Sequence, residues 1–449
     1  MLIDGQAYEY DRVLADEIGP RLTGSSNYEK AVDWSEGEFK RLGLANVHTE
    51  TWTIPSAWEP ETDAVAHILK PHGQRLHLES EGWGPSTPEG GVRGNVYLLS
   101  KLSVAAVHEQ VEAIQGHIVL VTPEALGDDE LLFGQLFDAL DAIGEVGAKG
   151  LLLGMGTTND APSFLGVGDF VGKASKLPTG NVGHVDTLLL ARMLEKGPVE
   201  IEFSFKNRIR SNVPVKNVVA EISGTDPDAG YVVGGLLDSW HPGTGAEDNG
   251  TGAASVLAVA QTVKAAGLKP RRTLRFILFG GEEEGLLGSL AYAHAHEQEM
   301  SKCAGVFVTD TGSEPPKGWL TFGREDVNKA LAPLKPLLDP LDAGGISDGH
   351  HIIFETDHAP FLVRGVPAFV LWTPFEKYMQ LHHKPSDTFD KVDRRDLGLG
   401  EAVVGLSAYY FASVAEIPGY LDAAKMEDTL KSIKAYNQYK DLVDHKMLP

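Results

Sequence analysis

The chain has 449 residues, and its 39 lysines and arginines against 63 aspartates and glutamates give a formal net charge of −24. This length predicts more than one domain, because single cores seldom grow beyond about 250–300 residues. The negative charge argues against nucleic acid or an anionic membrane surface as a partner. A lone cysteine, Cys303, excludes an internal disulfide framework and a cysteine-based zinc site.

The N-terminal sequence MLIDGQAYEYDRVLADEIG lacks the basic start and the apolar segment of a secretory signal. No apolar run approaches the ~18 residues that a membrane-spanning helix needs. From the sequence we therefore expect either a cytoplasmic protein or the trimmed mature form of an exported one.

In chain order, the first expected elements are helices over 8–18 and 28–42, the second of which ends at Gly43. From ETWTIPSAW to about Asn207, short β-like runs are separated by Gly, Pro and Asp, which predicts a β-rich segment with a few helices. We place this insert at about 85–205. Its strand-like runs are GNVYLL, GHIVLVT, GLLLGM and VEIEFSF.

From about Val213, apolar runs of strand length alternate with stretches of helical pattern, expected over 251–266, 286–300 and about 397–415. Buried strands that alternate with helices predict an α/β fold, in which helices sandwich a mixed, mostly parallel sheet. The expected strands are NVVAEIS, YVVGGLL, TLRFILFG, AGVFVTD and PAFVLW.

Acidic residues or imidazoles follow four of these strands. Functional groups of open α/β sheets gather at the carboxyl ends of strands. Carboxylates crowded at one edge repel one another unless a divalent cation binds, and oxygen with imidazole ligands suits zinc or a similar metal. We therefore predict a metal site. The residues, in strand order, are Asp238 and Asp248; Glu282, Glu283 and Glu284; Asp310; and His382 and His383.

Each of these residues taken alone has a simpler explanation. Asp248 can cap a helix, three consecutive glutamates can form a solvated surface, and Asp310 can start a turn. Their shared position after buried strands favours the metal site. An adjacent pair of glutamates also suits catalysis, because one carboxylate can bind metal while its neighbour acts as general base for metal-activated water.

Two other patterns have the wrong context. GISDG, residues 345–349, matches G-x-S-x-G but does not follow a strand or open a clear helix. GTGAEDNGTG resembles a phosphate-binding loop, yet it lacks the P-loop lysine, and its acidic residues repel phosphate.

The same segments resemble the M28 family of zinc exopeptidases, especially its carboxypeptidase Q-like members and the bacterial aminopeptidases with a protease-associated (PA) domain. The likeness covers nearly the whole chain, and its motifs occur in the family's order. They are EIGPRLTGS, GGLLDSW with GTGAEDNGTGA, FGGEEEGLLGS, VTDTGS, TDHAPF with GVPAF, and HHKPSDTFDKVD. The resemblance implies a catalytic domain formed by 1–84 and 206–449, with a PA-like domain inserted at 85–205.

The resemblance also implies a role for individual residues. It assigns general-base catalysis to Glu282 and an orienting role behind the metal to Asp238. The metal ligands that it implies are Asp248, Glu283, Asp310 and His383.

Leu236 departs from the family pattern, which has the first metal-binding histidine at this position of G-G-H-L-D-S-W. The family implies two metals, one held by that histidine with Asp248 and Asp310, the other by Asp248, Glu283 and His383. The second set is complete, and three protein ligands plus one water is the composition of a catalytic zinc site. We therefore expect one or two zinc ions per chain, with one of the two sites compromised.

We favour a zinc-dependent exopeptidase, an aminopeptidase or dipeptidase acting on short peptides, which by family resemblance is secreted or periplasmic. A homodimer is left open. Leu236 motivates two alternatives, an impaired pseudoenzyme that binds peptides and an engineered inactive variant. A third alternative is a glutaminyl-cyclase-type acyltransferase, since those distant relatives use one zinc on an Asp, Glu and His set. His241, five residues after Leu236, is a weaker candidate for replacing the missing ligand.

Overall fold

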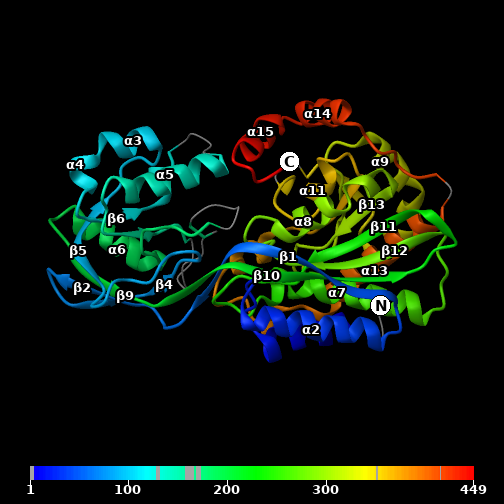
Figure 1. Cartoon of the computed structure of the whole chain (residues 1–449), viewed down its shortest axis with the longest axis horizontal. Helices are drawn as coiled ribbons and strands as arrows, with labels where there is room; N and C mark the ends of the chain where they lie inside the picture. Colours follow the sequence, from blue (N-terminus) through cyan, green and yellow to red (C-terminus); the bar gives the residue numbers. More distant parts are fainter. Residues whose placement is uncertain (1–4, 128–131, 157–165, 168–172, 350–351, 415) are drawn as a thin grey trace. The chain divides into compact units, whose positions relative to one another are not determined.

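The computed structural model describes residues 5–449 except 128–131, 157–165, 168–172, 350–351 and 415. The chain divides into two compact units, and it leaves the first unit near residue 54 and returns to it near residue 213 (Figure 1). The second unit is therefore an insert in the first. The first unit comprises Met1–Thr53, Pro214–His382 and Asp387–Pro449, and the second comprises Ile54–Val213 and His383–Ser386.

The first unit is built on an eight-stranded sheet in the order β1-β10-β12-β11-β13-β16-β14-β15. The central strands β12, β11, β13 and β16 are parallel, whereas β10 and β14 pair antiparallel with their neighbours. This confirms the predicted mixed sheet. The strands are β1 Ala45–Pro60, β10 Asn207–Ile222, β11 Asp226–Leu236, β12 Arg272–Phe279, β13 Cys303–Val308, β14 Gly318–Leu320, β15 Gly345–Ser347 and β16 Ala368–Trp372.

Helices cover both faces of this sheet. Helices α7 (Thr251–Ala265) and α13 (Arg394–Ser413) pack on β11 and β12, close to the bounds predicted for them. Residues 251–260 of α7 are all buried because their mostly small or apolar side chains pack on the sheet and on neighbouring helices. Figure 1 shows α8 (Leu287–Ala295) and α11 (Ala359–Leu362) on the opposite side of the strands.

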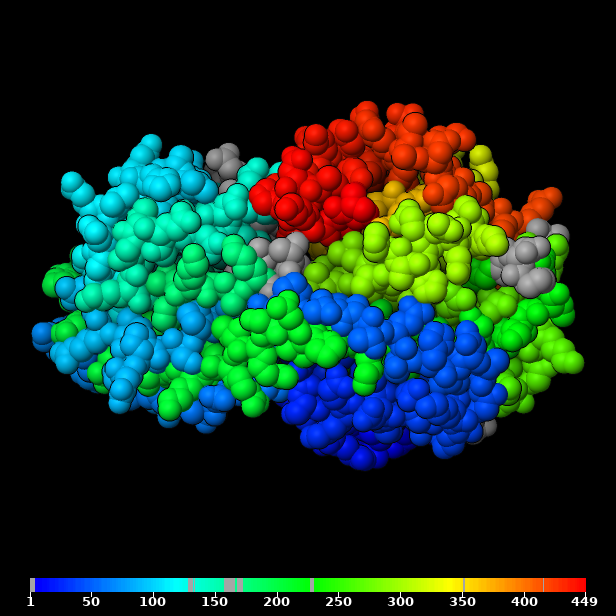
Figure 2. Space-filling model, in the orientation of Figure 1, coloured from blue at the N-terminus to red at the C-terminus, as the bar shows by residue number. Residues whose placement is uncertain are grey.

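The C-terminal helices α14 and α15 lie at the surface of the first unit, where Figure 2 shows them in red. Helix α14 buries Met426 and Leu430 and exposes its charged side chains, which is the amphipathic pattern of a surface helix. The remaining helical segments are α1 Ala7–Arg12, η1 Val13–Ile18, α2 Ser26–Arg41, η3 Ala246–Gly250, η4 Glu297–Lys302, α9 Glu325–Leu331, η5 Ala332–Leu334, α10 Lys335–Leu338, η6 Asp339–Leu341, α12 Glu376–Leu381, η8 Phe389–Lys391, α14 Ala423–Ser432 and α15 Tyr436–Asp444.

The central strands end at one level, and this alignment creates the edge that carries the candidate site. Leu236, the last residue of β11, pairs with Phe279, the last residue of β12. Val308, the last residue of β13, pairs with Gly234 of β11. The segments that follow these strands therefore start side by side, as the sequence pattern predicts.

The second unit contains its own sheet, in the order β3-β2-β9-β5-β6-β7-β8-β4. Ile118 and Leu120 of β6 pack in one hydrophobic cluster while Val119 and Val121 pack in another, so both faces of the sheet are buried. The unit's elements are β2 Val65–Lys70, β3 Gln74–Leu76, β4 Leu78–Ser80, β5 Val92–Leu98, α3 Val104–Glu109, α4 Val111–Ile114, β6 Ile118–Val121, η2 Pro123–Ala125, α5 Phe133–Glu145, β7 Gly150–Leu153, β8 Thr179–Val182, α6 His184–Leu194 and β9 Glu200–Ser204.

The unit contains the predicted insert of 85–205 and extends beyond it on both sides. It starts earlier because β2 pairs with β9 and β4 pairs with β8, which ties residues before 85 to the insert's own strands. Among the described residues, no helix is both long and apolar enough to cross a membrane.

Candidate metal centre

The loop that leaves β11 is clamped by Arg21, a fully buried residue of the N-terminal segment. Its Nε donates to the carbonyl oxygen of Leu237 at 2.7 Å, and its two Nη atoms donate to those of Thr244 and Gly245 at 2.9 Å each. Because the guanidinium holds its donors in a rigid plane, one side chain fixes both ends of the loop. The clamp therefore determines where the segment carrying Asp248 begins.

Asp387 positions the next turn, η3, through hydrogen bonds to its backbone. Its two carboxylate oxygens accept hydrogen bonds from the backbone N–H groups of Glu247 at 2.7 Å and Asp248 at 3.0 Å. Burial raises the pKa of Asp387 to about 6, although these hydrogen bonds act to lower it. Asp248, a residue only 4% exposed, is thus held at the strand edge by contacts to its own backbone.

Helix α12 is tied to the same turn by an ion pair between Lys377, which is partly exposed, and the buried Glu247. The Nζ of Lys377 lies 2.5 Å from Oε1 of Glu247, and the Ser313 hydroxyl donates to the same oxygen at 2.7 Å. Since α12 ends one residue before His382, this contact fixes the path of the chain into the histidine pair.

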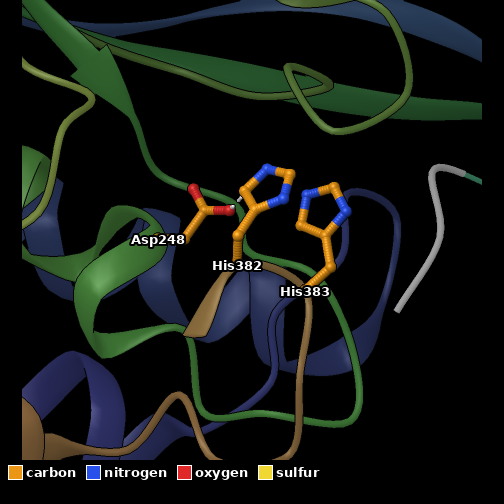
Figure 3. Close-up of side chains that lie close together, drawn as sticks. All are labelled: Asp248, His382 and His383. Carbon is orange, nitrogen blue, oxygen red and sulfur yellow. Dashed lines mark ion pairs between the residues drawn. The ribbon is translucent and has the colours of Figure 1, made fainter. Parts of the chain in front are cut away.

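Asp248, His382 and His383 form the one group of three or more metal-ligating side chains found within the described residues. Each offers a ligand atom, and these atoms all lie within 4.8 Å of one another. Figure 3 shows both imidazole rings beside the Asp248 carboxylate, with His382 the nearer. The Nε2 of His382 lies 3.6 Å from Oδ2 of Asp248, and His383 is held next to it by their shared peptide bond.

The three glutamates lie in the turn between β12 and α8. Glu282 is partly exposed, whereas Glu283 and Glu284 are buried. Although part of Glu282 is exposed, the protein that surrounds its carboxylate removes water and raises the pKa well above its usual range, and the neighbouring carboxylates of Asp310 and Glu283 raise it further. Burial and nearby carboxylates also raise the pKa values of Glu283 and Glu284. Such crowded acids favour the binding of a cation.

Asp310, two residues after the end of β13, is 8% exposed and accepts a hydrogen bond from the Tyr378 hydroxyl at 3.3 Å. Asp238 is fully buried and accepts from the Thr23 hydroxyl at 3.0 Å. Burial is the main cause that raises the pKa of Asp238. Leu236, where the family pattern has histidine, is also fully buried.

The structure therefore brings two of the four predicted ligands, Asp248 and His383, into one cluster, and it adds His382. Among the described residues, Glu283, Asp310 and His241 are not members of that cluster. Burial lowers the pKa of His241 to about 4, so this ring is neutral near pH 7.

Sequence reasoning missed the residues that position the site. For Arg21 a signal existed, since it lies in the EIGPRLTGS motif, but nothing in the motif indicates that it contacts a loop more than 200 residues away. Lys377 and Tyr378 belong to none of the M28-like segments, and neither residue type is a usual zinc ligand, so the sequence carries no signal for them.

The side chains at this edge fit a zinc ion or a similar divalent metal. Carboxylate oxygens and imidazole nitrogens are the ligand types that such ions take in catalytic sites. Several buried carboxylates lie near one another, while the nearby cations are engaged elsewhere, Arg21 with backbone carbonyls and Lys377 with Glu247. A divalent ion would balance this excess of negative charge.

Residues 217–405 match the sequence profile of Peptidase family M28, and this segment contains every candidate ligand and the candidate general base, Glu282. The chain is also 28% identical over 415 residues to carboxypeptidase Q of Mus musculus, with 92% of this chain and 87% of that protein covered. The structure is similar to that of a peptidase M28 precursor from Shewanella amazonensis, with a TM-score of 0.81, 27% identity, and coverage of 92% and 95%.

Residues 217–405 thus match peptidase family M28, and relatives that cover most of the chain support the same resemblance. A zinc aminopeptidase from Bacillus subtilis has the same fold, with a TM-score of 0.69 at 21% identity and coverage of 93% of this chain and 97% of that one. The resemblance inferred from the motifs is thus confirmed, and with it the assignment of the chain as a metallopeptidase of mixed α/β fold.

Proposed function

We propose that this protein is a zinc-dependent exopeptidase, an aminopeptidase or dipeptidase, that hydrolyses short peptides. The observation that carries the proposal is the cluster of Asp248 with two imidazoles at the sheet edge, where the Asp248 carboxylate is also close enough to act on the charge of Glu282. The zinc aminopeptidase among the structural neighbours supports the choice of metal.

Asp248, Glu283, Asp310 and His383 are the proposed ligands, in accordance with the family pattern. When bound, zinc would polarise the peptide carbonyl and lower the pKa of the attacking water. Glu282 would accept the proton from that water on a carboxylate oxygen and pass it to the leaving amine. Its partly exposed position supports this role, because a base must reach both water and substrate.

Zinc dependence tests the proposal. We expect the purified chain to cleave members of a panel of dipeptides and N-terminally free short peptides, with product amino acids measured by mass spectrometry. Removal of metal by a chelator should abolish turnover, and added zinc should restore it. Peptide hydrolysis that survives complete metal removal, verified by elemental analysis, would reject the proposed mechanism.

Leu236 supports a second candidate, an impaired enzyme that binds peptides without turnover. Its alkyl side chain cannot coordinate metal, and it is fully buried at the end of β11, where the family's first histidine would stand. The same experiment decides between the two candidates. Zinc uptake and peptide binding by calorimetry, without product from any peptide of the panel, would support the binding protein.

A further inference from the structure

His382, the residue that follows α12, has no role in the family pattern, yet its imidazole lies beside the carboxylate of Asp248. The separation of its Nε2 from Oδ2 of Asp248 is 3.6 Å. That distance exceeds the 2.7–3.2 Å, roughly, of a direct hydrogen bond. Two atoms bound to one zinc at about 2.0–2.2 Å in tetrahedral geometry lie about 3.3–3.6 Å apart. The pair therefore has the spacing of two ligands of one ion.

Contacts of Tyr378 and of the neighbouring Lys377 fix the position of His382. Its backbone N–H donates to the carbonyl oxygen of Tyr378 at 2.8 Å, and the rings of these two residues have centroids 5.3 Å apart. The Lys377–Glu247 ion pair holds the helix against the turn of Asp248. The His382 side chain is 25% exposed, so an ion can reach it from solvent.

Tyr378 also connects His382 to Asp310, a member of the ligand set that a histidine at position 236 would have completed. Its hydroxyl donates to Asp310, and its ring packs beside that of His382. In the family pattern, Asp310 and Asp248 share their metal with the histidine that Leu236 replaces. The imidazole of His382 thus lies beside Asp248 and is linked to Asp310 through Tyr378.

We propose that His382 is a metal ligand. Its imidazole, which lies beside the carboxylate of Asp248, replaces the imidazole lost at position 236. His382 then adds a second imidazole to the proposed ligands Asp248, Glu283, Asp310 and His383, and carboxylates with imidazoles form a donor set that suits zinc. This inference rests on the proposed zinc site but is independent of turnover. The competing explanation is a protonated His382 that forms only an ion pair with Asp248.

Zinc affinity separates the two explanations. We expect His382→Ala to weaken zinc binding by at least about 100-fold in a competition titration with a chromophoric chelator, since even residues that only orient ligands cost about 10–100-fold. His382→Gln is measured alongside because it retains most of the side-chain volume. Thermal unfolding in excess chelator verifies that each metal-free variant is folded.

A matched control is His296→Ala. His296 is also a histidine paired with a carboxylate, Glu50, at 3.0 Å within the same unit, and its loss should leave zinc affinity unchanged. In the double variant Leu236→His/His382→Ala, we expect zinc affinity to return to within about tenfold of the original, because the ligand count is restored. Cobalt substitution gives a second readout, since the visible spectrum should change in His382→Ala and recover in the double variant.

Three results would overturn the inference: unchanged zinc affinity in a folded His382→Ala, unchanged affinity in His382→Gln, or loss in His382→Ala with no recovery in the double variant. The outcome is distinct from that of the proposed function. A chain that binds zinc through His382 but cleaves no peptide refutes the exopeptidase and supports this inference. A zinc peptidase whose metal affinity does not change when His382 is replaced supports the exopeptidase and refutes this inference.

Discussion

Replacing Glu282 with glutamine is expected to lower kcat/KM for peptide hydrolysis by about 10²–10⁴-fold, the usual contribution of a general base. The amide has almost the same shape as the carboxylate but cannot accept the proton of the attacking water. Because Glu282 is not a proposed ligand, the variant should keep the zinc content of the original chain. Steady-state kinetics and elemental analysis on the same preparation measure both quantities.

Glu283→Gln is the matched comparison, since it removes the neighbouring carboxylate of the same turn. We expect this second variant to lose zinc affinity as well as rate, because Glu283 is a proposed ligand. A Glu282→Gln enzyme that retains its rate within about threefold would remove the proposed base. Equal zinc loss in both variants would show that the two roles had been assigned wrongly.

Replacing Arg21 with methionine is expected to lower the free energy of unfolding by about 3–5 kcal/mol, the cost of removing one partner from buried charge interactions. The change leaves three carbonyl oxygens of the β11 loop without their donor. It also leaves Asp11, a fully buried carboxyl whose pKa Arg21 acts to lower, without a compensating charge. Urea unfolding in excess chelator measures the effect apart from zinc binding.

Arg12→Met is the control for this experiment. Arg12 pairs with Glu9 and Glu17 through side chains that are well exposed to solvent, and such pairs contribute only about 0–1 kcal/mol. If Arg21→Met costs no more than Arg12→Met, the guanidinium is not what holds the loop in place. A loss of zinc affinity in Arg21→Met is expected in addition, because the loop leads directly into the segment of Asp248.

The central sheet could be predicted because its strands are continuous apolar runs. YVVGGLL and TLRFILFG form β11 and β12, and the acids that follow them do reach one edge, since the strands end in register. A parallel strand that is buried on both faces needs apolar residues at nearly every position, so its sequence is easily recognised. The three-residue strands β14 and β15 could not be predicted, because such short segments carry no periodicity. β14 forms on the edge that β16 offers, and β15 forms on the edge of β14.

The positioning of the site depends on contacts between distant residues, which no local pattern records. Asp248 could be recognised from its acidic turn, but the hydrogen bond from its backbone N–H to Asp387 spans 139 residues. Likewise, the family pattern selects His383 by its spacing to Asp387 and ignores His382. Only the path of α12, fixed by the Lys377–Glu247 pair, places the first histidine beside Asp248.

The structure gives Leu236 a role that the sequence alone does not indicate. In the sequence it is a missing ligand in an M28 pattern. In the structure it is a fully buried core residue at the end of β11, and an imidazole from another segment lies beside the carboxylate that would have shared its metal.

The most direct test is a zinc anomalous difference map from crystals of the chain equilibrated with zinc. We expect a peak about 2.0–2.2 Å from a carboxylate oxygen of Asp248 and about 2.0–2.1 Å from an imidazole nitrogen of the histidine pair. A well-ordered map with no anomalous peak at Asp248 would contradict the assignment of this edge of the sheet as the metal centre.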